Sequence, residues 1–309
     1  MNEKLSDVLR QLPSGVVQGA IYALIALGYS LVYGILGMIN FAHGEVYMVG
    51  AYAGILALAV CTGFGLSLPA LAAVLLATIF AVAVCAAYGA TIERVAYRPL
   101  RNAHALAPLI SAIGVSTFLQ NYVRLAQGND VKQFPEAYRG AFGSGTLEWV
   151  EPPQPVRSLA ILAVAIAVMV AFHLFTQRTR TGTAMRACSM DRTMAALVGV
   201  DVDRVIGLTF AVGSGLAALA GIMVSMHLSQ ATYTDGYLYG MKAFTAAVLG
   251  GIGNLPGAML GGMVLGLVEA AGVGLFGGAY RDAYSFVVLM AVLIVRPRGL
   301  LGERVAEKV

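Results

Sequence analysis

Two short polar segments interrupt the long apolar stretches of this sequence, and they hold the residues best suited to chemistry. The first, residues 37–47, places Asn40, His43 and Glu45 beside Gly44. An ionised carboxylate at the centre of a membrane helix costs about 2.5–3.5 kcal/mol on insertion scales, so such a residue usually faces a partner or a water-filled path. A tight turn is the alternative, with Glu45 in the first turn of the next helix, where the helix dipole favours negative charge. The turn explains Glu45 but not the polar residues around it.

The second segment, residues 240–257, contains a short apolar run that follows Lys242 and ends in glycines and Pro256. Glycine and proline together interrupt a helix here. Short interrupted segments in two halves of a chain indicate a transporter binding site, although the identity between these two segments does not establish a duplication. Unwound backbone at membrane depth must be buried in protein or line a wet cavity. The predicted substrate path therefore consists of Asn40, Phe41, His43, Gly44, Glu45, Tyr47, Lys242, Phe244 and Thr245.

The sequence contains no other pattern that carries chemistry. Its four histidines lack HxxxH or HxxE spacing, and neither a GxSxG nucleophile motif nor a GxxxxGK[ST] phosphate loop occurs. Cys61, Cys85 and Cys188 have no pairing pattern and are interpreted as small apolar side chains. A membrane-embedded enzyme would need a catalytic constellation that is missing. We therefore expect no cofactor on this chain, and energy for uphill transport would come from ions or from a partner.

Composition places these segments in a membrane protein. Of 309 residues, 59% are hydrophobic and only 12% are charged, whereas soluble domains carry about 25% charged residues. So few charges could not cover a water-facing surface, so lipid must contact the chain. The net charge of +4 is spread over loops that flank the membrane, which argues against a nucleic-acid partner.

Nine apolar runs could contribute to crossing a bilayer, and the ninth, residues 239–252, has only about two-thirds of the length needed. A span needs about 20 apolar residues. The prediction is an all-α, polytopic membrane helix bundle of eight or nine spans, forming one transmembrane domain over residues 1–309, with interrupted helices near residues 37–47 and 240–257. Three GxxxG pairs, at Gly50, Gly257 and Gly262, are typical of close helix contacts. The runs are residues 15–36, 44–61, 68–90, 106–125, 159–177, 205–226, 257–276 and 284–295, and the short one is 239–252.

Arginine clusters predict the orientation of the spans. They follow the third run, fill residues 178–204 and return at the C-terminus, so these regions should be cytoplasmic. The loop 128–157 has no basic excess and should lie outside. With an external N-terminus, the C-terminus ends inside only if residues 239–252 also cross. Nine crossings are therefore predicted.

The cytoplasmic loop 178–204 is predicted to contain a short amphipathic helix from Thr183 to Gly199. Apolar residues recur there at helical intervals, Gly199 is a suitable C-cap, and Asp201 or Asp203 could cap the next span. A flat face of small residues favours docking on another protein, while an ordinary amphipathic helix would rest on the membrane surface.

Four segments resemble the permeases of branched-chain amino acid ABC importers, specifically the LivH-type subunit. They are residues 19–48, which include Asn-Phe-Ala-His-Gly-Glu, and residues 92–101, 241–257 and 296–302. The resemblance implies a homologous second permease subunit of LivM type, two cytoplasmic ATPase subunits that bind ATP and Mg²⁺, and a periplasmic amino-acid-binding protein. It also implies a bacterial inner-membrane location. In such importers a cytoplasmic helix docks on the ATPase, and by analogy the docking residues are Arg186, Asp191, Arg192, Ala195 and Gly199.

The leading hypothesis is a permease that passes leucine, isoleucine or valine inward. The helix N-termini at the two breaks would meet the substrate carboxylate, and Phe41, Tyr47 and Phe244 would line the side-chain path. Related permeases for urea and short amides carry similar elements, so that substrate class stays open. The rival from another class is an ion-coupled carrier that uses Glu45, Lys242 and Glu269.

Overall fold

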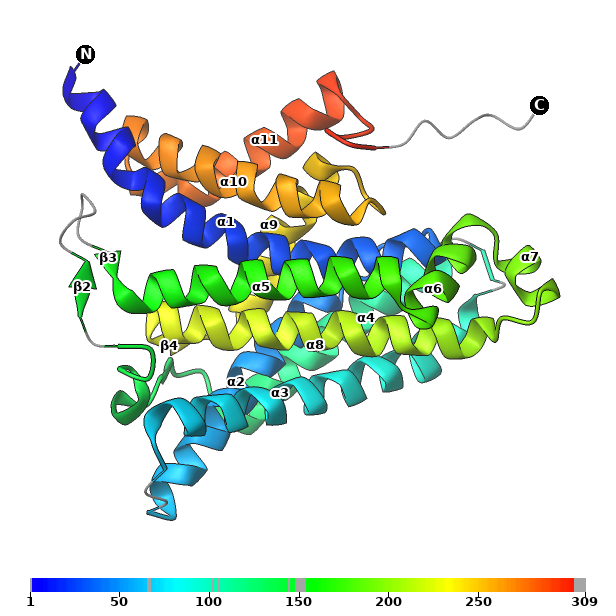
Figure 1. Ribbon diagram of the computed structural model, residues 1–309, viewed down its shortest axis with the longest axis horizontal. Helices are drawn as coiled ribbons and strands as arrows, with labels where there is room; N and C mark the ends of the chain where they lie inside the picture. Colours follow the sequence, from blue (N-terminus) through cyan, green and yellow to red (C-terminus); the bar gives the residue numbers. More distant parts are fainter. Residues whose placement is uncertain are drawn as a thin grey trace.

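The chain folds into an elongated bundle of helices whose loops gather at its two ends (Figure 1). The computed structural model describes residues 2–65, 68–101, 103–104, 106–143, 145–147 and 154–302. The main helices are α1 (Asn2–Leu36), α2 (His43–Gly63), α3 (Ala70–Ile92), α4 (Leu106–Gln127), α5 (Val156–Arg178), α6 (Arg180–Met190), α7 (Arg192–Leu197), α8 (Val202–Leu228), α9 (Asp235–Gly250), α10 (Leu255–Phe276) and α11 (Arg281–Val295). The predicted all-α membrane bundle is confirmed.

Short elements connect these helices. A π-helix (Glu93–Tyr97) and a 3₁₀ turn (Arg98–Leu100) extend α3, and two further 3₁₀ turns are Glu136–Tyr138 and Gly278–Tyr280. Two pairs of two-residue strands occur in the described residues: β1 (Lys132–Gln133) with β4 (Gln230–Ala231), and β2 (Thr146–Leu147) with β3 (Gln154–Pro155), both antiparallel. Of the predicted external loop 128–157, residues 144 and 148–153 lie outside the described part.

The short helix α9 joins the two sides of the bundle. Within the described residues, eight helices are long and apolar enough to cross a membrane, and α9, with 16 residues, is not among them. Strand β4, just before α9, pairs with β1 of the external loop. At the other end of α9, the amides of Leu300 and Leu301 in the arginine-rich tail donate to the carbonyls of Leu249 and Gly250. Helix α9 thus runs from the side of loop 128–157 toward the arginine-rich tail, the direction that the predicted ninth crossing requires.

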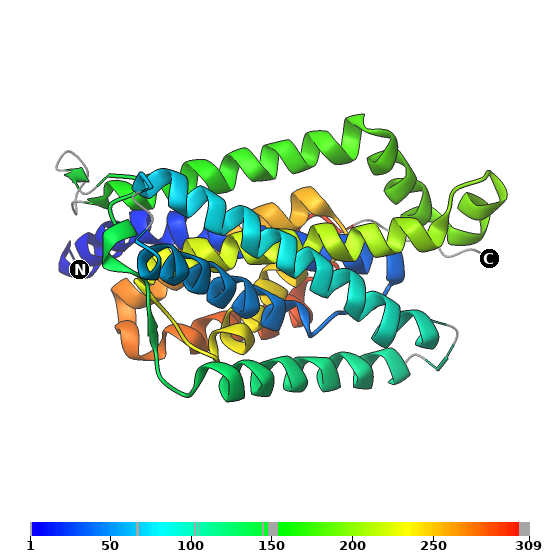
Figure 2. The same ribbon diagram turned by 90° about the horizontal axis from the view of Figure 1, so that it is seen from below.

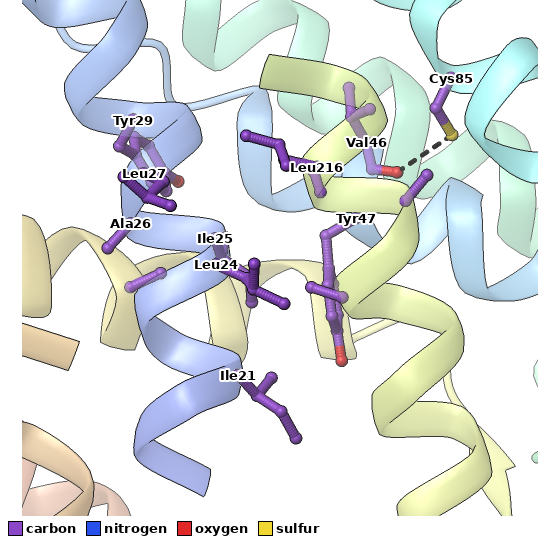
Figure 3. Close-up of a cluster of buried hydrophobic side chains, with 14 of the residues drawn as sticks. Ile21, Leu24, Ile25, Ala26, Leu27, Tyr29, Val46, Tyr47, Cys85 and Leu216 are labelled. Atoms are coloured by element: carbon purple, nitrogen blue, oxygen red, sulfur yellow. Dashed lines mark hydrogen bonds between the residues drawn. The ribbon is translucent and has the colours of Figure 1, made fainter. Parts of the chain in front are cut away.

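Helix α1 forms the centre of the bundle. Its residues from Ala20 to Leu27 have no exposed surface, and Figure 3 shows part of this core, where α1 faces Tyr47 and Leu216. In the same region the Cys85 thiol donates to the Val46 carbonyl across 3.5 Å. These contacts join α1, α2, α3 and α8 in one apolar core.

All three predicted GxxxG pairs lie at helix contacts. A Cβ atom on Gly50 would meet Ala218 of α8, one on Gly261 would meet the α9 backbone, and one on Gly262 would meet Ala23 of α1. Small residues allow this close approach, which membrane helices use in place of hydrophobic burial.

Helices α1 and α8 run in opposite directions along the bundle (Figure 2). Helix α1 ends at Leu36 and is followed by Gly37 with φ +69°, whereas α8 ends at Leu228 and is followed by Ser229 with φ +60°. The next helices begin at His43 and Asp235. Every one of these pairs is separated by 192 positions (228 minus 36, 229 minus 37, 235 minus 43). These matching boundaries indicate an internal repeat in which α1 and the start of α2 correspond, in inverted direction, to α8 and the start of α9.

The prediction of one cytoplasmic helix from Thr183 to Gly199 is wrong, because two helices, α6 and α7, occupy this loop. The chain is extended at Asp191, whose carboxylate accepts the amides of Thr193 and Met194 and so begins a new helix. The flanking predictions are confirmed: Gly199 has φ +89°, and the Asp201 carboxylate caps α8 by accepting the Arg204 amide.

Candidate functional site

The first break lies deep in the bundle. The His43 Nε2–H donates to the carbonyl of Ile25 across 3.2 Å, and Ile25 precedes the end of α1 by 11 residues (36 minus 25). At about 1.5 Å per residue this is about 17 Å, roughly half of a 30 Å hydrocarbon core. The chain therefore turns back after α1 and begins α2 inside the bundle, about 17 Å back along α1 from its end. The Asn40 side chain holds the turn, since its oxygen accepts the Ala42 amide at 3.1 Å and the Tyr97 hydroxyl at 2.9 Å.

The second half begins α9 in the same manner from the opposite side. The carboxylate of Asp235 accepts the Thr232 amide at 2.7 Å and the Thr232 hydroxyl at 2.6 Å, which fixes the turn before the helix. The segment 251–254 then separates α9 from α10, and Asn254 caps α10 by accepting the Gly257 amide at 2.9 Å. The break predicted over 240–257 is thus confined to its second part.

The N-terminal turns of α2 and α9 pack directly against each other. A Cβ atom on Gly44 would collide with the Gly236 carbonyl and lie 2.8 Å from the Gly240 Cα. One turn further along, the rings of Tyr47 and Tyr239 stack with centroids 5.3 Å apart. Only glycine at these positions lets the two backbones approach so closely. Helices α2 and α9, which come from opposite ends of the bundle, therefore meet at their N-terminal turns.

A cavity of about 200 Å³ lies beside this contact, between α2, α4 and α9. The carboxyl group of Glu45, a residue only 2% exposed, lines it. The Ser116 hydroxyl of α4 donates to Glu45 Oε1 at 3.4 Å, while Oε2 has no hydrogen-bond partner among the residues that the structure describes. The other lining residues are Tyr29, Phe41, Ile113, Thr117, Gln120, Gly236, Tyr237, Gly240 and Met241.

Several predicted path residues gather at this cavity, and others support it from behind. Phe41 lines it, and the centroid of the Phe41 ring is 5.9 Å from that of the Phe244 ring. Gly44 and Tyr47 form the helix contact described above, and His43 and Asn40 hold the turn. Thr245 is fully buried and donates to the Met241 carbonyl of its own helix. Their assignment to the substrate path stays a prediction.

Lys242 lies in a different polar cluster, which joins α1, α9, α10 and α11. Its Nζ is 3.0 Å from Glu269 Oε1 and 2.7 Å from Asp282 Oδ1, and Arg281 pairs with Glu269 at 3.4 Å. The Tyr22 hydroxyl donates to Glu269 Oε2 at 2.9 Å. Two cations and two anions balance here, so the buried Glu269 is an interhelical anchor rather than an isolated charge. The structure does not bring Lys242 to Glu45.

Sequence reasoning missed Ser116, Gln120 and Tyr237. Ser116 and Gln120 sit in an apolar run that reads as an ordinary span, and nothing in their spacing points to Glu45. Ser116 and Glu45 are 71 residues apart in the sequence, and only tertiary packing brings α4 against α2.

A larger polar cavity of about 560 Å³ lies where the end of α3 meets the start of α8. Arg101 pairs there with both Glu93 and Asp203, and Arg98 pairs with Asp203. These ion pairs fasten the start of α8 to the segment after α3. We interpret this cluster as structural, because its charges pair with one another.

The predicted docking residues divide between exposed and buried positions on α6 and α7. Arg192 and Gly199 are exposed, and Arg186 is held against the Gln177 side chain at 2.5 Å. Ala195 is only 3% exposed, so it cannot form part of a docking face in this conformation, and Asp191 caps α7. The exposed apolar surface of this tip comes instead from Met190, Met194, Leu197 and Val198.

The fold and site define a polytopic membrane protein in which two helices, α2 and α9, begin inside the bundle and meet at their N-terminal turns beside a buried polar cavity. Residues 12–295 match the family described as branched-chain amino acid transport system / permease component, and the chain belongs to this family. The LivH permease of Salmonella typhimurium and that of Escherichia coli K12 are each 45% identical over the full length of both chains. The BraD permease of Pseudomonas aeruginosa is 47% identical over 97% of this chain and 98% of its own. No solved structure matches.

This membership defines a component of a transport system, a multi-pass membrane protein that is not itself an enzyme. The ion-coupled carrier and the urea permease are not favoured by these matches.

Proposed function

We propose that this chain is one permease subunit of an ATP-driven ABC importer that passes leucine, isoleucine and valine across a bacterial inner membrane. The observation that carries the proposal is the match of 45–47% identity over essentially the whole chain to high-affinity branched-chain amino acid permeases. The re-entrant pair α2 and α9, with its buried polar cavity, supplies a place for a small polar molecule inside the membrane.

The proposed complex also contains a homologous LivM-type permease, two ATPases that carry ATP and Mg²⁺, and a periplasmic binding protein. The tip formed by α6 and α7 supports ATPase docking, because Met190 is 90% and Leu197 is 76% exposed on the arginine-rich side. Exposed apolar groups of this kind at one tip are typical of a protein contact. Helix α11 is almost entirely exposed within this chain, so lipid and the second permease would cover it.

The rival ion-coupled carrier would place its charged residues in one pathway. Glu45 and Lys242 belong to separate sites, and Lys242 is neutralised by Glu269 and Asp282. This separation supports a path powered by partner subunits.

Purification in mild detergent, followed by reconstitution, tests the proposal. The tagged chain should co-purify with two ATPase subunits, and proteoliposomes should take up labelled leucine only with ATP and the binding protein. Urea should not compete. Leucine uptake by the chain alone under an ion gradient would contradict the proposal, as would a stable ATPase complex that moves urea but not leucine.

A further inference from the structure

The unpaired carboxylate of Glu45 is unusual for a charge buried in a membrane bundle. Buried ionisable groups are normally paired or fully hydrogen-bonded. In the part of the chain that the structure describes, no ion pair involves Glu45, its Oε2 is buried without a hydrogen-bond partner, and the residue lines the 200 Å³ cavity. Glu269, another buried carboxylate, pairs with Lys242 and Arg281 and accepts the hydroxyls of Tyr22 and Ser285. Glu45 is therefore a buried carboxylate beside the cavity without a counter-ion among the described residues.

Two helix N-termini flank this carboxylate. Glu45 is the third residue of α2, and its Oε2 lies so close to Gly236, in the first turn of α9, that a Cβ atom there would collide with it. Each N-terminus carries about half a positive charge, which stabilises an anion without a counter-ion on its cavity side. The same arrangement opposes a second anion, because Glu45 already occupies the positive ends. On this arrangement a substrate would present a cationic group, rather than its carboxylate, to these N-termini.

The walls of the cavity complete a site for a primary ammonium on an apolar body. The rings of Tyr29 and Phe41 stand beside the carboxylate, and aromatic faces attract cations. Ile113 and Met241 supply apolar surface, and Ser116 supplies a hydroxyl already bonded to Glu45 Oε1.

We propose that the cavity between α2, α4 and α9 is a binding site for a primary ammonium group, with the carboxylate of Glu45 as its acceptor. On the proposed function, on which this inference rests for its natural ligand, the group is the α-ammonium of the amino acid in transit. Its carboxylate then points away from Glu45, and its aliphatic side chain contacts Ile113 and Met241.

Charge-selective labelling tests the site without relying on transport. Ser116→Cys is placed in a background with Cys61, Cys85 and Cys188 replaced by alanine, in the assembled transporter. Rates are measured with cationic aminoethyl and anionic sulfonatoethyl methanethiosulfonate and divided by those of a free thiol. The cationic reagent should react at least about tenfold faster relative to the anionic one, because an unpaired carboxylate acts at short range in a poorly screened site. Adding Glu45→Gln should abolish the preference.

Competition identifies the group that is recognised. Leucine and isopentylamine, which lacks the carboxylate, should slow labelling of Ser116→Cys, whereas the α-keto acid of leucine, which lacks the ammonium, should not. Equal rates for the two reagents, or a preference that survives Glu45→Gln, would overturn the proposal. Protection by the keto acid alone would do so too.

Uptake in the native cysteine background gives a second, independent measurement. Leucine uptake should fall at least tenfold in Glu45→Gln and recover in part in Glu45→Asp, with both variants retaining their ATPase subunits; equal uptake by Glu45→Gln and the unmodified chain would contradict the site. If the unmodified complex takes up no leucine, the proposed function fails, yet the labelling preference still decides whether the cavity takes an ammonium group.

Discussion

Tyr47 and Tyr239 stack with ring centroids 5.3 Å apart and planes 28° from parallel, at equivalent positions of the two inverted halves. Their separation is 192 residues (239 minus 47), the same as between the ends of α1 and α8 and between the starts of α2 and α9. A pair of equivalent residues that contact each other lies on the pseudo-twofold axis relating the halves. The axis therefore passes beside the Gly44–Gly236 contact and the Glu45 cavity. This location at the repeat interface is where transporters built from inverted repeats hold their substrates.

The glycine contact between α2 and α9 should tolerate no side chain. Gly44→Leu should abolish leucine uptake, and Gly236→Ala should reduce it strongly, because a Cβ at either position meets backbone or Glu45. Overpacking of this kind costs about 1–3 kcal/mol or more. Apparent Tm and uptake of the purified complex measure both effects. The matched control is Gly63→Ala, where a Cβ would meet nothing within 4 Å. Normal uptake by Gly44→Leu would disprove this account of the contact.

The buried ion cluster should stabilise the second half of the bundle. Lys242→Met should lower stability by about 1–3 kcal/mol, less than the 3–5 kcal/mol typical of a broken buried pair, because Arg281 remains beside Glu269. The double variant Lys242→Met with Glu269→Gln should be less destabilised than the two single losses combined. Thermal unfolding in detergent compares these variants with Glu136→Gln, which removes an exposed pair with Arg139 and should change little. Additive losses would show that the pair is not coupled.

The exposed tip of α7 should bind the ATPase subunits. Leu197→Asp should reduce the yield of co-purified ATPase at least tenfold, because contact with the partner would bury an unpaired charge. Leu197→Met should retain the ATPase. The stability of the permease chain itself should change by no more than about 0.5 kcal/mol, because the side chain is exposed in this chain. Quantitative pull-down at equal expression measures the yield. Unchanged ATPase recovery with Leu197→Asp would remove Leu197 from the docking surface.

Asp191 should act on docking through the shape of the α6–α7 turn. Asp191→Ala removes the side chain that caps the Thr193 and Met194 amides, at a cost of about 1 kcal/mol to α7. Hydrogen exchange of the α7 amides should accelerate severalfold, and ATPase recovery should fall with it. Asp191→Asn keeps a capping oxygen and should restore both. If the asparagine variant exchanges slowly but still loses the ATPase, the carboxylate itself contacts the partner.

The sequence by itself determined the features that depend on local composition. Apolar runs and arginine clusters predicted a nine-crossing membrane bundle, because the cost of placing polar groups in lipid is paid residue by residue. Glycine, proline and acidic residues likewise located the breaks after Leu36 and Gly250 and the Asp201 cap, because these residues act on the backbone next to them. The resemblance to the LivH-type permeases rested on short segments of the sequence, above all Asn-Phe-Ala-His-Gly-Glu.

Only the tertiary structure decided which polar residues meet. Spans such as α2 and α3 are apolar around their whole circumference, so no periodic pattern states which face contacts a neighbour. Glu45 and Lys242, similar candidates in the sequence, therefore have opposite surroundings: Lys242 is neutralised by Glu269 and Asp282, while Glu45 faces a cavity beside Ser116. The internal repeat was hidden for a related reason. The matching parts share the end of one helix, a left-handed residue and the start of the next helix, which depend on turn geometry rather than on similar side chains.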